Sequence, residues 1–156
     1  AGQDGMPLLL LMTEVLAGTS PLEEANRAQV VVFSGHDTNI VNLAGLLGLH
    51  WNNSPFPADS TPPGSMLLFR LWDTPQGRIV QPSFLCQTST AFLSTDDAVM
   101  SGAALRQESL LLPEAFTETP AGPGLTLDAF LALVHGLAGD ELASRLPGLF
   151  PEENRP

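Results

Sequence analysis

The stretch from residue 30 to residue 51, VVVFSGHDTNIVNLAGLLGLHW, changes character twice over a short distance. It opens with a continuous β-branched run at 30–33, turns at Ser34 and Gly35, and continues with apolar residues at helical spacing over 39–49. An apolar run without alternation is typical of a strand covered on both faces, as in a parallel sheet. A strand that leads directly into a helix therefore predicts an α/β fold.

The segments on either side of this stretch add a helix and a β-hairpin. Residues 6–17, MPLLLLMTEVLA, predict a helix with Pro7 in its first turn, followed by Gly18 as a stop. After a Pro-rich loop at 52–65, two strand-like runs over 66–88 are separated by TPQG, which predicts a hairpin.

Two single residues refine the hairpin. Gly77 stands where the turn needs a positive φ. Pro82 lies inside the second run, and because proline cannot donate to a ladder it suggests an edge strand or a bulge.

The last third of the chain has a weaker pattern of secondary-structure signals. Residues 89–124 are rich in proline and glycine and are expected to be mostly loop with weak helical pieces. Residues 126–138 predict a helix that Thr126 could cap, and 140–146 predict a further short helix. The tail at 146–156 is expected to fray.

Composition excludes several classes of function. The net charge is -11 and all six basic residues are arginines, so the chain lacks the basic stripe needed to bind nucleic acid or an anionic membrane. No apolar run is long enough to cross a bilayer, and no secretory signal is visible. Cys86 is the only cysteine, so it can form neither an internal disulfide nor a thiolate metal site, and it is expected to be a small buried hydrophobe.

The polar turn between strand and helix is the candidate site. Ligands of open α/β sheets bind at the carboxyl ends of the strands, and the first amides of a helix favour anions. Gly35 would let the backbone approach such an anion, and His36 as imidazolium could donate hydrogen bonds to phosphate oxygens. Asp37, whose ionisation the same anion disfavours, could protonate a leaving alkoxide. The spacing therefore suggests hydrolysis of a phosphate ester.

A purely structural interpretation of the same residues stays open. Asp, Thr and Asn all cap helices, so Asp37 or Thr38 could be a simple N-cap and His36 a satisfied turn residue.

Longer stretches show a family resemblance. The matches Gly35, His36, Asp37, Thr38, Asn39 and Trp51 resemble the second signature of the histidine acid phosphatases, the branch with phytases, periplasmic acid phosphatases and glucose-1-phosphatases. The segment ADSTPPGSMLLFRLW resembles the strand that follows in that family, and GMPLLLLMTEVLAG resembles the preceding helix. The likeness extends over residues 5–88, and LDAFLALV is similar to the last helix of the family.

The resemblance implies a fold and a mechanism. The fold is a three-layer α/β/α domain whose mixed sheet includes the β-hairpin, and residues 1–156 would be its carboxyl-terminal portion. A histidine in an upstream Arg-His-Gly motif attacks phosphorus, His36 helps to bind the phosphate, and Asp37 protonates the leaving oxygen. Gly35, Thr38 and Asn39 are expected to join His36 in substrate binding, and no metal or other cofactor is required.

The chain departs from the family in one respect. It contains no Arg-His-Gly, and the other histidines, His50 and His135, have no flanking arginines. His50 is expected to end a helix, and His135 to be a packed or surface residue. Alone, the chain is expected to be inactive on its phosphate monoester substrate. We expect a missing amino-terminal segment, a companion chain or a second copy.

Three alternatives remain open at this point. The chain is part of an acid phosphomonoesterase, a non-catalytic phosphatase-like module that binds an anion or a partner, or one chain of a two-chain enzyme. Periplasmic or secreted placement rests on the resemblance alone.

Overall fold

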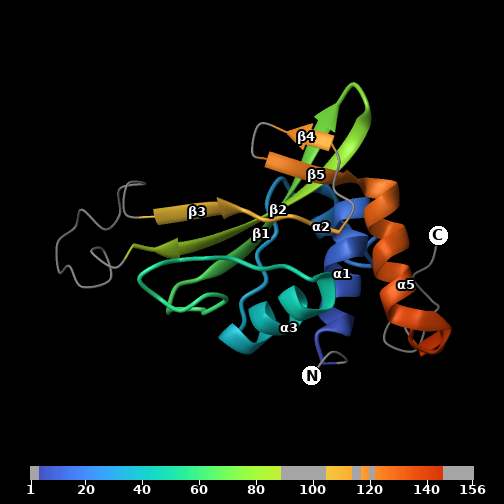
Figure 1. Ribbon diagram of the computed structural model, residues 1–156. Coiled ribbons are helices and arrows are strands. Elements are labelled where there is room, and N and C mark those ends of the chain that lie inside the picture. Colours follow the sequence, from blue (N-terminus) through green and yellow to red (C-terminus); the bar gives the residue numbers. More distant parts are fainter. Residues whose placement is uncertain (1–3, 89–104, 114–116, 120–121, 146–156) are drawn as a thin grey trace.

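The structure, a computed structural model, describes residues 4–88, 105–113, 117–119 and 122–145, the last six of these for the backbone only. The helices are α1 (Met6–Ala17), α2 (Glu23–Arg27), α3 (Asp37–Leu47) and α5 (Leu127–Arg145). The strands are β1 (Met66–Thr74), β2 (Gly77–Gln87), β3 (Leu105–Ser109), β4 (Thr117–Thr119) and β5 (Gly122–Thr126). In the described part of the chain, α1, α2 and α3 come first, β1 to β5 follow and form one sheet, and α5 comes last (Figure 1).

Helix α1 begins and ends where the sequence predicts. Pro7 lies in its first turn, and Gly18 ends it in the left-handed region at φ 76°, with its N–H donated to the carbonyls of the last turn. Its buried residues recur at helical spacing and form one buried stripe, which is apolar except for Thr13. They are Met6, Leu9, Leu10 and Thr13. The predicted helix at 39–49 is also confirmed, as α3, which Gly48 ends at φ 63°.

The β-hairpin is confirmed as well. Strands β1 and β2 pair antiparallel from Thr74 opposite Gly77 to Met66 opposite Leu85. Gly77 has φ 107°, and the Thr74 hydroxyl donates to its carbonyl at 2.8 Å. A residue with a side chain would be strained at this φ, so the glycine fixes the turn and therefore the register.

Pro82 does not lie on an edge strand, so that alternative is wrong, and the continuous register with β1 shows no bulge on that side. Strand β2 is interior: it pairs β1 on one side, and on the other side β5 at Ile79 and Val80 and β3 from Ser83 onward. The Pro82 carbonyl accepts the N–H of Leu110 at 3.0 Å, so the position without an N–H faces the side where β2 changes neighbours. The proline therefore breaks no rung of the ladder to β1.

The region 89–124 is not mostly loop where the structure describes it, since it contains β3, β4 and the first residues of β5. These strands are three to five residues long, and β3 (LRQES) is largely exposed, so an apolar alternation does not mark them. Residues 89–104, 114–116 and 120–121, together with the tail expected to fray at 146–156, lie outside the described residues.

Helix α5 combines the two helices predicted at its position. The Thr126 hydroxyl accepts the N–H of Ala129 at 3.2 Å, which confirms the predicted cap. The backbone of Gly139 (φ 66°, ψ 162°) is not helical and kinks the element between its two parts.

The strand predicted at 30–33 is wrong for this chain. The segment belongs to no ladder, and Val30 and Val32 are 77% and 81% exposed. A strand exists only where a neighbour takes its backbone hydrogen bonds, and the described residues supply none here. Every strand pairing that the structure describes is antiparallel.

The core lies on one face of the sheet. Val80, Phe84 and Cys86 of β2 point into it together with the apolar stripes of α1, α3 and α5. Cys86 is 2% exposed, which confirms the prediction that it is a buried small hydrophobe. The α/β class and the hairpin are thus confirmed. Among the described residues, no helix has both the length and the apolarity to span a bilayer.

Candidate functional site

The candidate site is the turn at the start of α3. His36 is the N-cap residue, with an extended backbone at φ -113° and ψ 168°, and Asp37 is the first helical residue. The structural interpretation that made Asp37 or Thr38 the N-cap is therefore wrong by one or two positions. His36, Asp37 and Thr38 are exposed, whereas Asn39 is half-buried.

Two backbone N–H groups of the turn donate hydrogen bonds to side chains of the turn itself. The side-chain oxygen Oδ1 of Asn39 accepts the N–H of His36 at 2.8 Å, and Oδ1 of Asp37 accepts the N–H of Thr38 at 2.8 Å. The carbonyl of His36 accepts the N–H of Asn39 at 3.0 Å. The backbone of the turn is therefore held by these bonds, while His36 and Asp37, adjacent in the sequence, are exposed to solvent.

The described arginines do not complete an anion site at this turn. Arg70 donates to Ser83 and Gln107 across three strands, and Arg106 donates to the carbonyl of Ser54. In the part of the chain that the structure describes, neither His36 nor Asp37 has an ion pair with an arginine. The turn on its own can offer one imidazole and one carboxyl group, but not the positive charge that surrounds a bound phosphate ester.

A pocket lies at another place, between the hairpin tip and the start of α5. Its lining residues are Gln76, Gly77, Arg78, Thr126, Leu127 and Asp128. It includes none of the predicted site residues. No group of three metal-ligating side chains occurs among the described residues.

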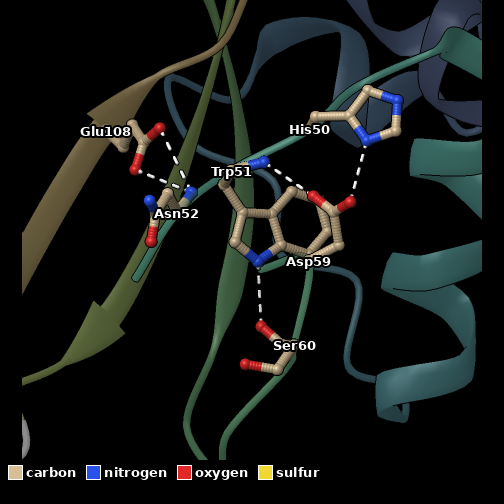
Figure 2. Close-up of polar contacts among 6 residues, drawn as sticks. All are labelled: His50, Trp51, Asn52, Asp59, Ser60 and Glu108. Carbon is tan, nitrogen blue, oxygen red and sulfur yellow. Dashed lines mark hydrogen bonds and ion pairs between the residues drawn. The ribbon is translucent and has the colours of Figure 1, made fainter. Parts of the chain in front are cut away.

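The other end of α3 carries a polar cluster that the sequence analysis missed (Figure 2). Nδ1 of His50 donates to Oδ2 of Asp59 at 2.8 Å, and the backbone N–H of Trp51 donates to Oδ1 of the same carboxylate at 2.8 Å. Asp59 has φ 58°, an unusual value for a residue with a side chain. Its own backbone N–H donates a hydrogen bond to the carbonyl of Trp51. These bonds close the Pro-rich loop at 52–65 onto the end of α3.

This cluster changes the titration of one group. The hydrogen bond from His50, and then that from the Trp51 amide, lower the pKa of Asp59 below its ordinary value. The Trp51 ring is buried, stacks on Phe84 with centroids 4.3 Å apart, and donates its Nε1–H to the carbonyl of Ser60. Trp51, which the family resemblance included, thus anchors the loop to the core. His135 is exposed on α5, in line with the expectation of a packed or surface residue. His50 does not end a helix: α3 ends at Leu47, and His50 lies beyond it with its ring bonded to Asp59.

Comparison with known proteins identifies the class. The sequence profile of the histidine phosphatase superfamily (branch 2) matches residues 6–90, which include α1, α3 and the hairpin. This match covers more than half of the chain, so the chain belongs to that superfamily, as the sequence analysis expected.

The particular relatives are phytases. Phytase AppA of Escherichia coli (strain K12) is 36% identical over 88 residues, which are 53% of this chain and 20% of that phytase. The phytase from Citrobacter braakii matches with a TM-score of 0.70 and 27% identity, over 85% of this chain and 34% of the other. The Klebsiella sp ASR1 phytase matches with a TM-score of 0.69 and 19% identity, over 87% and 34%, and this likeness shows the fold alone.

The expected histidine-phosphatase fold is thereby confirmed for the part that this chain contains. The chain spans about a third or less of the length of each of these relatives.

Proposed function

We propose that this chain supplies the proton donor and one phosphate-binding residue of an acid phosphomonoesterase that works through a phosphohistidine intermediate. The observation that supports this most directly is the turn itself: His36 and Asp37 stand exposed and adjacent at the N-terminus of α3, in a chain of the histidine phosphatase superfamily. Because the similar proteins are phytases, we propose a phosphate monoester as the class of substrate.

Each residue has a distinct role in this proposal. The imidazolium of His36 donates a hydrogen bond to a phosphate oxygen, and the N-terminus of α3 adds its positive dipole end. Asp37 gives its proton to the ester oxygen as the bond between that oxygen and phosphorus breaks, so the alcohol leaves neutral. Thr38 can donate its hydroxyl to the same phosphate. Gly35 and Asn39, which the sequence analysis counted among the substrate-binding residues, maintain the shape of the turn in this proposal and do not contact the phosphate.

In the same proposal, the nucleophilic histidine belongs to a segment outside this chain. The chain has three histidines and none follows an arginine, so no Arg-His-Gly motif is present. We propose that residues 1–156 act as the carboxyl-terminal portion of a phosphatase domain whose other portion brings that motif. A periplasmic or secreted location also remains a proposal from the family resemblance.

The exposed segment at 30–33 supports a role for a second polypeptide segment. Val30 and Val32 leave most of their surface in water, Phe33 is 36% exposed, and the segment has no ladder partner among the described residues. β-Branched residues are poorly suited to such an exposed segment and well suited to a strand inside a sheet. The partner segment would also bring arginines to a chain of net charge -11.

The division of the site is tested with pure protein. The 156-residue chain is expected to hydrolyse p-nitrophenyl phosphate no faster than buffer, and to gain activity when it is joined to a segment with Arg-His-Gly. Robust turnover by the chain alone would refute the proposed division, because it would require a nucleophile within these residues.

A non-catalytic module is the second candidate, and one observation favours it. The amides of His36 and Thr38, which an anion would use, already bond to Asn39 and Asp37. A module of this kind would show phosphate binding by titration calorimetry with no hydrolysis, even when the complementary segment is present.

A further inference from the structure

The glycine and the asparagine of the turn are in direct contact. A methyl group placed on Gly35 would lie 2.6 Å from Oδ1 of Asn39 and 3.2 Å from its Cγ. Real side chains essentially never approach so closely, and Gly35 is not among the glycines with positive φ. Its backbone conformation therefore does not demand glycine, but a side chain at position 35 would have to displace Oδ1 of Asn39.

The same oxygen of Asn39 is already engaged. Its Oδ1 accepts the N–H of His36 at 2.8 Å, and the carbonyl of His36 accepts the N–H of Asn39 at 3.0 Å. This reciprocal pair joins the N-cap residue to the third residue of the helix, as the acidic or amide side chain of a capping box does. A displaced Asn39 side chain would release the backbone of His36.

We propose that Asn39 is a positioning residue, which holds the backbone of His36 through Oδ1, and that position 35 is glycine to leave room for that oxygen. In this arrangement the phosphate contacts His36 and not Asn39. Gly35 is needed to leave room for Asn39 and not for contact with the phosphate. The catalytic consequence of this proposal rests on the proposed function, whereas the contact itself does not.

The contact is tested in the 156-residue chain by a double-mutant cycle. The readout is the exchange rate of the His36 backbone amide, measured by magnetisation-transfer NMR. Asn39→Ala is expected to speed this exchange about fivefold, which corresponds to the loss of a typical capping hydrogen bond. Gly35→Ala is expected to do the same because its methyl group displaces Oδ1.

The double variant distinguishes a shared cause from two separate ones. Gly35→Ala added to Asn39→Ala is expected to change the rate no further, because the obstructing oxygen is gone. Additive effects, or an unchanged His36 amide in Asn39→Ala, would overturn the proposal. Asn42→Ala, the same change one turn along α3, is the matched control and is expected to leave the His36 amide unchanged.

The positioning role is tested in the complete enzyme by comparing two substitutions of Asn39. Asn39→Asp keeps an acceptor oxygen at the same place, so it is expected to lose much less turnover than Asn39→Ala. If Asn39 instead held phosphate through its amide N–H groups, a carboxylate would repel the substrate, and Asn39→Asp would raise KM more than Asn39→Ala. That second result would overturn the proposal. Absence of hydrolysis in the unsubstituted complete enzyme would refute the proposed function and leave the exchange result standing.

Discussion

Replacement of Val32 by alanine tests whether segment 30–33 is an unfilled strand position. A Val→Ala change removes two carbon groups, worth about 1.6 kcal/mol when they are fully buried, at about 0.8 kcal/mol for each CH₂. Val32 is 81% exposed, so only about a fifth of that burial is realised in this chain. The expected loss of unfolding free energy is therefore about 0.3 kcal/mol.

Val80 provides the matched control. It is 0% exposed, so the same substitution is expected to cost roughly 2 kcal/mol or more, because a cavity adds to the lost transfer energy. Urea denaturation of both variants, followed by circular dichroism, measures the difference as a shift in midpoint at constant slope. When the chain is joined to the complementary segment, the cost of Val32→Ala is expected to approach that of Val80→Ala. Equal costs in the isolated chain would refute the reasoning, because Val32 would then already be packed.

Three further outcomes follow from the described contacts. Asp59→Asn lowers thermal stability at neutral pH, and the difference from the unsubstituted chain disappears at low pH. The pKa of Asp59 is lowered in the folded chain, so its contribution is complete above its ordinary value of 3.8 and is lost as pH falls through the lowered folded value. A difference that does not shrink as the pH falls below 3.8 would contradict this. Thr126→Ala costs about 1 kcal/mol in urea denaturation, because α5 loses its cap, and Thr126→Ser restores most of it. Cys86 reacts with a thiol reagent only as fast as the chain opens, because it is buried, and immediate labelling without denaturant would show otherwise.

Local signals in the sequence were sufficient to predict the helix ends and the hairpin turn. Pro7 and Gly18 delimit α1, Gly77 fixes the hairpin turn, and Thr126 caps α5, because each acts on the backbone within a few residues. Strands β3 to β5 were missed, since they are short and owe their existence to pairing with β2 and with one another.

The candidate site could be proposed for the same local reason, whereas its role in binding and catalysis stays a prediction. Five consecutive residues carry it, so the sequence alone brings them together. The bond between Asn39 and His36, and the closure of the loop by Asp59, depend on side-chain geometry that composition and spacing do not express. The strand predicted at 30–33 does not form, because its pairing depends on a neighbour that the described residues do not contain.

The role of Asp37 as proton donor is tested most directly by the dependence of the Asp37→Asn variant on the leaving group. In the complete enzyme this variant is expected to hydrolyse an alkyl phosphate about 10²–10⁴-fold more slowly than the unsubstituted enzyme, because the alkoxide leaves without its proton. Its loss on p-nitrophenyl phosphate is expected to be much smaller, since that leaving group is stable as an anion. An equal loss on both esters, or unchanged turnover of the alkyl ester, would contradict the assignment of Asp37.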